Sequence, residues 1–190
     1  MKKTTLAYVI CGSFCTMERS IKEMEKLSKS GYEIIPIMSY NAFNWDTKFG
    51  KALDFRLKIE NICGKQIIHT IPDAEPIGPK KMADIMLIAP CTGNTLAKLT
   101  NGITDTPALM AAKSHLRINR PLVIALATND ALGASAQNLG KILNTKNAYM
   151  VPLKQDSPTI KPHSMVSNFD LIPEAIDMAI NNKQIQPCFI

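Results

Sequence analysis

The sequence lacks three patterns that would each decide a functional class. Its five cysteines form no C-x-x-C pair and no histidine stands at metal-ligand spacing, so we expect no metal site. No apolar run approaches the roughly 18 residues of a membrane-spanning helix. The first strand-like segment is not followed by G-x-G-x-x-G, and the second ends in Ser39 rather than an acidic residue. Those two features argue against a tightly held dinucleotide.

Clustered charge is also scarce. The net charge of +6 is spread over separate basic groups without interleaved aromatic residues, so we expect no nucleic-acid partner, only an environment suited to anionic ligands. The opening MKKTTLAYVICGS has a short apolar run and no small-residue cleavage site, which favours a first strand over a signal peptide. We therefore expect a cytoplasmic protein that does not enter a membrane.

Apolar strand-like segments alternate with amphipathic helical ones along the whole chain. The strand-like segments are 5–10, 32–38, 65–69, 85–89, 122–127 and 149–151, the fourth ending at Pro90, which cannot donate to a sheet ladder. Apolar residues recur at helical spacing over 17–27, 49–62, 96–103, 135–143 and 173–180. This alternation predicts one α/β domain over residues 1–190, a doubly wound, Rossmann-like or flavodoxin-like parallel sheet with helices on both faces.

Small polar turns follow four of the predicted strands. The clearest is 91–95, Cys-Thr-Gly-Asn-Thr, between a strand and a helix N-terminus, where backbone N–H groups and the helix dipole favour a phosphate. An ordinary helix cap is the alternative for this turn taken alone. The carboxyl ends of parallel strands share one edge, so the four turns together predict a mononucleotide site such as FMN. Its candidate residues are Gly12, Ser13, Ser39, Thr92, Gly93, Asn94, Thr95, Thr128 and Asn129.

The C-terminal quarter of the chain contains a proline- and serine-rich segment, 152–173, which we interpret as a lid-like loop. Lys161 and His163 in it are candidates for catalytic groups that face an anionic substrate, and a solvated loop is the alternative. The tail 184–190 is predicted to be extended. Cys91 lies beside the phosphate turn, but no His/Asn arrangement supports it as a nucleophile. Trp45, Phe49 and Phe55 lie at helical spacing and are predicted to be core residues.

The segment A-D-I-M-L-I-A-P-C-T-G-N-T-L-A-K, followed by G-I-T-D, resembles the signature of the flavoprotein superfamily of flavin-dependent cysteine decarboxylases. Members of that superfamily read A-P-A-T-A-N-T and then G-I-A-D. The resemblance implies FMN as cofactor, with Gly12, Ser13 and Ser39 at its phosphate, and L-A-T-N at 126–129 resembles the P-A-M-N segment. Three residues depart from the pattern: Pro76 stands where the decarboxylases carry a catalytic histidine, Gly93 replaces alanine and Thr128 replaces methionine.

Within the superfamily the chain is most similar to one branch of two-subunit synthases, on the segments 128–143, 151–166 and 183–187. In that branch a B subunit works with a separate A subunit during sporulation, and together they oxidise a dihydropyridine dicarboxylate to the aromatic dicarboxylate of the spore core. The resemblance implies an oxidoreductase subunit, active with its partner, whose oxidant is the flavin or an NAD(P) supplied through the A subunit. We also expect a homo-oligomer. The alternatives are a decarboxylase or flavin prenyltransferase of the same superfamily, or a non-catalytic flavin-binding scaffold.

Overall fold

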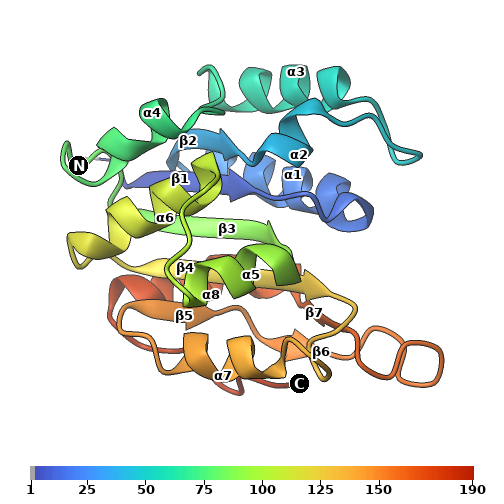
Figure 1. Cartoon of the computed structure of the whole chain (residues 1–190). Helices are drawn as coiled ribbons and strands as arrows, with labels where there is room; N and C mark the ends of the chain where they lie inside the picture. The colour runs from blue at the N-terminus through green and yellow to red at the C-terminus, as the bar shows by residue number, and fades with distance from the viewer. Residues whose placement is uncertain (1–2) are drawn as a thin grey trace.

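A computed structural model describes residues 3–190 (Figure 1). Its strands are β1 (Thr5–Ile10), β2 (Glu33–Met38), β3 (Ile85–Cys91), β4 (Leu122–Thr128), β5 (Ala148–Met150), β6 (Leu153–Lys154) and β7 (Met165–Ser167). They form one sheet in the order β2-β1-β3-β4-β7-β6, and β5 pairs with β4. The pairs among β1 to β5 are parallel, whereas β7 is antiparallel to β4 and β6 is antiparallel to β7. The predicted α/β sheet is confirmed, with an antiparallel ribbon at one edge.

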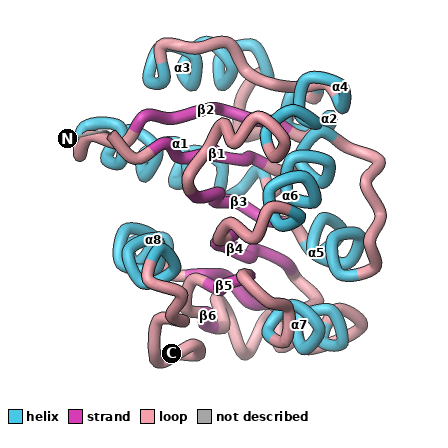
Figure 2. The backbone as a smooth tube through the Cα atoms, turned by 90° about the vertical axis from the view of Figure 1, so that its left-hand side faces the viewer, coloured by secondary structure: helices cyan, strands magenta, loops and turns pink. Residues whose placement is uncertain are grey.

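Helices cover both faces of the sheet, as Figure 2 shows along its edge. The helices are α1 (Phe14–Lys29), α2 (Tyr40–Asn44), α3 (Ala52–Cys63), α4 (Ile71–Ala74), α5 (Gly93–Thr100), α6 (Pro107–Arg117), α7 (Ala136–Leu143) and α8 (Ile172–Ile180), with short 3-10 turns η1 (Glu75–Ile77) and η2 (Phe169–Leu171). Alternate residues of each buried strand enter two separate cores. Leu6 and Tyr8 of β1 pack with α1, α3 and α8, while Ala7 and Val9 pack with α4, α5, α6 and α7.

The first helix follows from its apolar spacing. Met17, Ile21, Met24 and Leu27 lie on one face of α1 and are at most 1% exposed. Such an apolar stripe stabilises a helix chiefly by packing it against the sheet. The chain leaves the helix through Gly31, whose φ of 98° is a conformation that favours glycine. The predicted helix and its stop signal are both confirmed.

Proline behaves differently in the two strands that contain it. Pro36 lies within β2, an edge strand, and its carbonyl accepts from the Ile68 amide on the outer side, so the missing N–H costs no sheet bond. The prediction that β3 ends at Pro90 is wrong. The strand continues to Cys91, because the Pro90 carbonyl still accepts from the Cys11 amide. The register against β4 shifts between Ile88 and Cys91, which accommodates the proline.

Two other expectations need correction. Residues 65–69 do not form a strand, because only Ile68 reaches the sheet, through a single bridge to Ile37 of β2. Of the three aromatic residues predicted to be core, Phe55 is buried on α3, but Trp45 and Phe49 are 57% and 49% exposed. Both lie in the loop before α3 begins at Ala52, so the helical spacing that was assumed for them does not apply.

The segment 152–173 is more regular than the predicted loop. Its ends form β6 and β7, a short antiparallel hairpin that continues the sheet beyond β4. Residues 155–164 between these strands form the actual loop, and the Ser164 hydroxyl at its end donates to the Thr128 carbonyl at 3.2 Å. In the tail, Phe189 bridges to Leu153 of β6, and the Leu153 amide donates to the Cys188 carbonyl. The tail therefore runs beside the hairpin.

Candidate functional site

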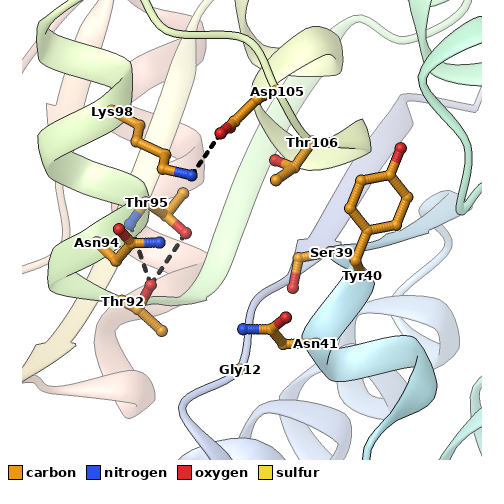
Figure 3. Close-up of a pocket in the computed structure, with 10 residues that line it drawn as sticks. All are labelled: Gly12, Ser39, Tyr40, Asn41, Thr92, Asn94, Thr95, Lys98, Asp105 and Thr106. Atoms are coloured by element: carbon orange, nitrogen blue, oxygen red, sulfur yellow. Dashed lines mark hydrogen bonds and ion pairs between the residues drawn. The ribbon is translucent and has the colours of Figure 1, made fainter.

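A polar cavity of about 430 Å³ lies at the carboxyl ends of β1 and β3 (Figure 3). This is the switch point of the sheet, where β2 and β3 lie on opposite sides of β1 and open α/β sheets bind their ligands. Residues of the β3–α5 turn form one wall and residues that follow β2 form the facing wall. The lining residues are Gly12, Ser39, Tyr40, Asn41, Thr92, Asn94, Thr95, Lys98, Asp105 and Thr106.

Three capped helix N-termini meet at this cavity. Ser39 caps α2, Thr92 caps α5 and Thr106 caps α6, each through a hydroxyl that accepts a backbone amide three residues later. The Thr92 hydroxyl accepts from the Thr95 amide at 3.1 Å and also donates to the Thr95 hydroxyl at 3.0 Å. The first two amides of a helix have no intrahelical acceptor, so those of Gly93 and Asn94 remain for a ligand. The turn at 91–95 can therefore cap α5 and still offer amides to an anion, so the helix-cap alternative and the anion-site prediction are compatible.

The charged groups that line the cavity are Lys98 and Asp105. Their ion pair joins α5 to the loop before α6, with 2.6 Å between the Lys98 Nζ and the Asp105 Oδ2. The Lys98 side chain is 28% exposed and Asp105 is 51% exposed, so water screens the pair. Lys98 lies one turn beyond Thr95 and can supply a cation to a phosphate in the cavity. The helix N-termini make the cavity suitable for an anion, and Lys98 adds a cation when it exchanges Asp105 for the ligand.

A second hollow of about 480 Å³ adjoins the first and shares Gly12 and Thr92 with it. It contains two rings, Phe14 and Phe49, and the end of β4. The predicted residues Ser13, Gly93, Thr128 and Asn129 line this hollow rather than the polar cavity. The structure therefore brings all nine predicted binding residues to one edge of the sheet, divided between a polar compartment and a partly aromatic one.

Lys161 and His163 lie in the loop 155–164, and only one of them borders a cavity. Lys161 lines a small hollow of about 110 Å³ with Ser13, Thr128 and Asn129. Its Nζ lies 3.6 Å from the Asp156 carboxylate. His163 is exposed and contributes its carbonyl to the Leu132 amide. Lys161 is therefore the better placed of the two candidates to contact a ligand.

The two cysteines nearest the cavity are buried thiols. Cys11 and Cys91 are at most 1% exposed. Burial raises the pKa of Cys11 to about 11, against a smaller opposing effect of hydrogen bonds from Thr95 and Thr92. Burial also raises the pKa of Cys91 well above its ordinary value. Neither thiol forms a thiolate at neutral pH, so the nucleophilic role considered for Cys91 has no support in its surroundings.

Pro76 lies in η1, which packs against α6 and precedes the start of β3. It is therefore at the amino edge of the sheet, whereas the polar cavity lies at the carboxyl edge. It lines neither compartment of the site in its own chain.

Several residues of the site were not among the sequence candidates: Tyr40, Asn41, Lys48, Lys98, Asp105, Thr106 and Asp130. Some carried a signal. Thr106 precedes Pro107, and a hydroxyl residue before a proline is typical of a helix N-terminus. Asp105 is the last residue of the G-I-T-D segment that is part of the resemblance. Lys48 carried no signal, because it lies in an irregular loop whose path depends on tertiary packing. In the residues that the structure describes, no helix is long and apolar enough to cross a membrane, and no cluster of His, Cys, Asp or Glu has the arrangement of a metal site.

Comparison with known proteins agrees with this architecture. Residues 1–175 match the model of the family described as flavoprotein. The structure of an FMN-dependent cysteine decarboxylase, SpaF, superposes with a TM-score of 0.67 over 93% of this chain and 97% of that one, at 23% identity. That likeness concerns the fold. The chain belongs to the flavoprotein family.

Two relatives place it further within that family. The chain is 42% identical to the dipicolinate synthase B subunit of Bacillus subtilis, over 100% of its own length and 95% of the relative. The crystal structure of the corresponding B subunit from Bacillus halodurans superposes with a TM-score of 0.90 at 38% identity, covering 98% of this chain and 96% of that one. Its branch of the family is that of the dipicolinate synthase B subunits, which confirms the resemblance found in segments 128–143, 151–166 and 183–187.

Proposed function

We propose that this chain is the FMN-binding B subunit of a dipicolinate synthase and acts in the cytoplasm. The observation that carries the proposal is the pair of joined compartments at the switch point of the sheet. The polar one offers helix amides, hydroxyls and Lys98 to a phosphate. The adjoining one offers the Phe14 and Phe49 rings and apolar wall to a flat ring system. Family membership and the FMN dependence of the structurally similar decarboxylase support the same cofactor.

The residues divide the work of holding such a ligand. Ser39 and Thr95 donate hydroxyl hydrogen bonds to the phosphate, and the Thr92 hydroxyl orients that of Thr95 by donating to it. The amides of Gly93 and Asn94 add the positive end of α5. Gly12 lets the backbone pass between the compartments without a side chain. When bound, a flavin supplies hydride-accepting chemistry. The chain itself positions the substrate dicarboxylate and excludes water from one side of it.

The reaction implied for the complex is the oxidation of dihydrodipicolinate to dipicolinate. It removes a hydride and a proton from the ring, and aromatisation drives it. The oxidant is the flavin or a nicotinamide supplied through the dipicolinate synthase A subunit. We propose that the A subunit completes the site. Lys48 and Lys161, whose long side chains line the second hollow and the small hollow beside it, can then face an anionic substrate held between the two proteins.

We also propose that copies of the chain associate with one another. Leu53 and Leu57 on the outer side of α3 are 53% and 51% exposed, and Trp45 in the preceding loop is 57% exposed. Apolar side chains grouped in this way are typical of an interface. Sedimentation of the isolated chain tests this, and a monomer at micromolar concentration would contradict it.

The FMN site is tested by titrating the refolded apoprotein with FMN and following flavin fluorescence. A hydrogen bond to a charged phosphate contributes about 1.5–3 kcal/mol, so Ser39→Ala combined with Thr95→Ala should weaken binding by at least about 100-fold. Ser28→Ala, at the opposite end of α1, is the matched control and should bind FMN like the parent chain. Absence of FMN binding by the parent chain would refute the proposed cofactor.

A decarboxylase of the same superfamily is the second candidate function. Pro76 argues against it. In the decarboxylases that the chain resembles, a histidine at this position transfers a proton, and proline cannot. The chain should not turn over 4′-phosphopantothenoylcysteine or a C-terminal peptidyl cysteine. Release of carbon dioxide from either substrate above a control without protein would favour this second function.

A further inference from the structure

We propose that Asp130 is the proton acceptor of the oxidation and that Thr128 positions it across Gly93. The inference rests on the proposed function and adds to it the group that removes the ring proton. Asp130 follows β4 at the carboxyl edge and lines the second hollow with Gly12, Phe14 and Asn129. The charged residues among those that line this hollow are Lys48 and Asp130, so Asp130 is its carboxylate.

Hydrogen bonds hold both oxygens of this carboxylate. The Thr128 hydroxyl donates to the Asp130 Oδ1 at 2.5 Å, and the Ser135 hydroxyl donates to the Oδ2 at 3.0 Å. The backbone is fixed as well, because the Asp130 carbonyl accepts from the amides of Gly133 and Ser135. A carboxylate has about four lone-pair directions, so two bonds leave acceptor capacity free toward the hollow. An exposed aspartate that is merely solvated needs no such double anchor.

The position of the Thr128 hydroxyl depends on Gly93. A Cβ added to Gly93 would lie 2.5 Å from the Thr128 Oγ1 and 3.1 Å from the Asp130 Oδ1. Any side chain at 93 therefore displaces the hydroxyl and presses on the carboxylate. The absence of a side chain at Gly93 therefore leaves the room in which the Thr128 hydroxyl orients the acid.

The location also suits a negatively charged group. Gly93 is the first residue of α5, so the carboxylate lies close to the positive end of that helix. The β3–α5 turn, which contains Gly93, separates the Asp130 carboxylate from the polar cavity, where the phosphate of FMN is proposed to bind. A substrate ring stacked beside the flavin ring in the second hollow would thus contact Asp130 on one side while its hydride leaves toward the oxidant.

The step balances as a two-electron oxidation. One C–H bond of the dihydropyridine dicarboxylate breaks with its electron pair, and the hydride passes to the oxidant, a flavin or a nicotinamide. The second C–H bond breaks toward Asp130, which gains the proton as an O–H, and the electron pair that is left joins the ring π-system. The products are the aromatic dicarboxylate, the reduced oxidant and a protonated Asp130 that releases its proton to water.

The test uses the complex of this chain with its A subunit, and measures dihydrodipicolinate oxidation by each variant. General-base catalysis contributes about 10²–10⁴-fold, so Asp130→Ala should lower kcat by at least about 100-fold while the FMN dissociation constant changes by less than about threefold. Added formate, a small carboxylate, should restore the rate of Asp130→Ala at least about tenfold. Asp130→Asn, which keeps the size of the side chain, gives the same loss if the alanine variant does not fold.

Thr128 is tested as a positioning residue. Thr128→Val keeps the shape and removes the hydroxyl, so it should lower kcat about tenfold, whereas Thr128→Ser should restore most of the parent rate. Asp177→Asn on α8, at the amino edge, is the control and should be as active as the parent. An Asp130→Ala rate within about threefold of the parent, or no response to formate, would overturn the assignment. If the parent complex itself does not oxidise the substrate, the proposed function fails before any variant is compared.

Discussion

At the scale of single residues, a buried histidine shows how the interior couples to solution pH. His115 on α6 is completely buried, and its Nε2 lies 3.1 Å from the Pro121 carbonyl. Its Nδ1 is buried and has no hydrogen-bond partner in the part of the chain that the structure describes. Desolvation therefore lowers the pKa of His115 to about 4, and the bond to Pro121 only partly opposes this.

The lowered pKa predicts a loss of stability in acid. The unfolded chain protonates this imidazole near its ordinary pKa of about 6.5 and the folded chain does so only near pH 4, so stability falls as the pH falls between these values. We expect His115 to account for about 2–3 kcal/mol of the free energy of unfolding lost between pH 7 and pH 4.5.

Urea denaturation of the parent chain and of His115→Gln at both pH values measures this effect. Glutamine can still donate to the Pro121 carbonyl but does not titrate, so the variant should lose correspondingly less stability in acid. Carboxylates in surface ion pairs titrate alike in both proteins, so the difference between the two isolates the histidine. Equal losses in the two proteins would show that His115 is not responsible.

At the scale of elements, one hydroxyl cap only stabilises its helix, whereas a second one also lines the binding cavity. Thr70 caps α4 by accepting from the Asp73 amide, and α4 lies away from the cavity. Thr92 caps α5 and lines the cavity. The same chemical change at these two caps therefore separates helix stability from ligand binding.

Replacing either threonine with alanine should lower the free energy of unfolding by about 0.5–2 kcal/mol, because each removes one cap. Only Thr92→Ala should also weaken FMN binding, by roughly a factor of ten or more, because the Thr92 hydroxyl orients the Thr95 hydroxyl and the turn that bind the charged phosphate. Thermal unfolding and FMN titration of both variants check this. An equal loss of FMN affinity in Thr70→Ala would mean that the binding defect arises from general destabilisation.

The loop 155–164 is the second element with a predicted role. Lys161 lines the small hollow beside Asn129, and its exposed ion pair with Asp156 contributes little, so its Nζ can turn to a ligand there. Lys161→Ala and His163→Ala should lower oxidation by the complex while FMN binding persists, with the larger effect from Lys161. Lys29→Ala, at the end of α1, is the control. Loop variants with parent-like turnover would identify 155–164 as a solvated connection.

Regular elements were predictable from the sequence because burying one face of a helix or a strand requires apolar residues at a regular spacing. Strands β1 and β4 and the apolar face of α1 follow directly from that spacing. The extent of β3 did not, because a register shift allows Pro90 to stay in the strand. Trp45 and Phe49 were misplaced because their spacing is helical but their backbone is not.

The candidate site was predictable to the extent that it consists of turns directly after strands. Gly12, Ser39 and Thr92 could be found in this way, since parallel strands end at one edge. Asp130 could not, because it lies in a loop and is held there by hydrogen bonds from Thr128 and Ser135. Asp105 stood in the G-I-T-D segment of the resemblance, but its contact with Lys98 was not predictable. Such contacts depend on the path of the backbone and leave no periodic pattern in the sequence.

At the scale of the whole molecule, the loop 155–164 lines the small hollow beside the second hollow, where we propose that the A subunit completes the site. We expect the isolated chain to oxidise little or no dihydrodipicolinate and the addition of the A subunit to restore activity. Absorbance of the product, recorded for each protein alone and for the mixture, measures this. Full activity of the isolated chain would show that its site is complete without a partner.

The strand order also determines when the site can form during synthesis. β3 inserts between β1 and β4, so the central strand pairs with partners on both sides that lie far from it in the sequence. Pairings of this kind form slowly, because the entropy of closing a long loop is lost before the new contacts offset it. The Thr128 end of the site leaves the ribosome after the phosphate turns have already emerged. A nascent chain would therefore expose the unpaired backbone edge of β3 until β4 arrives, which makes this interval the one most open to aggregation.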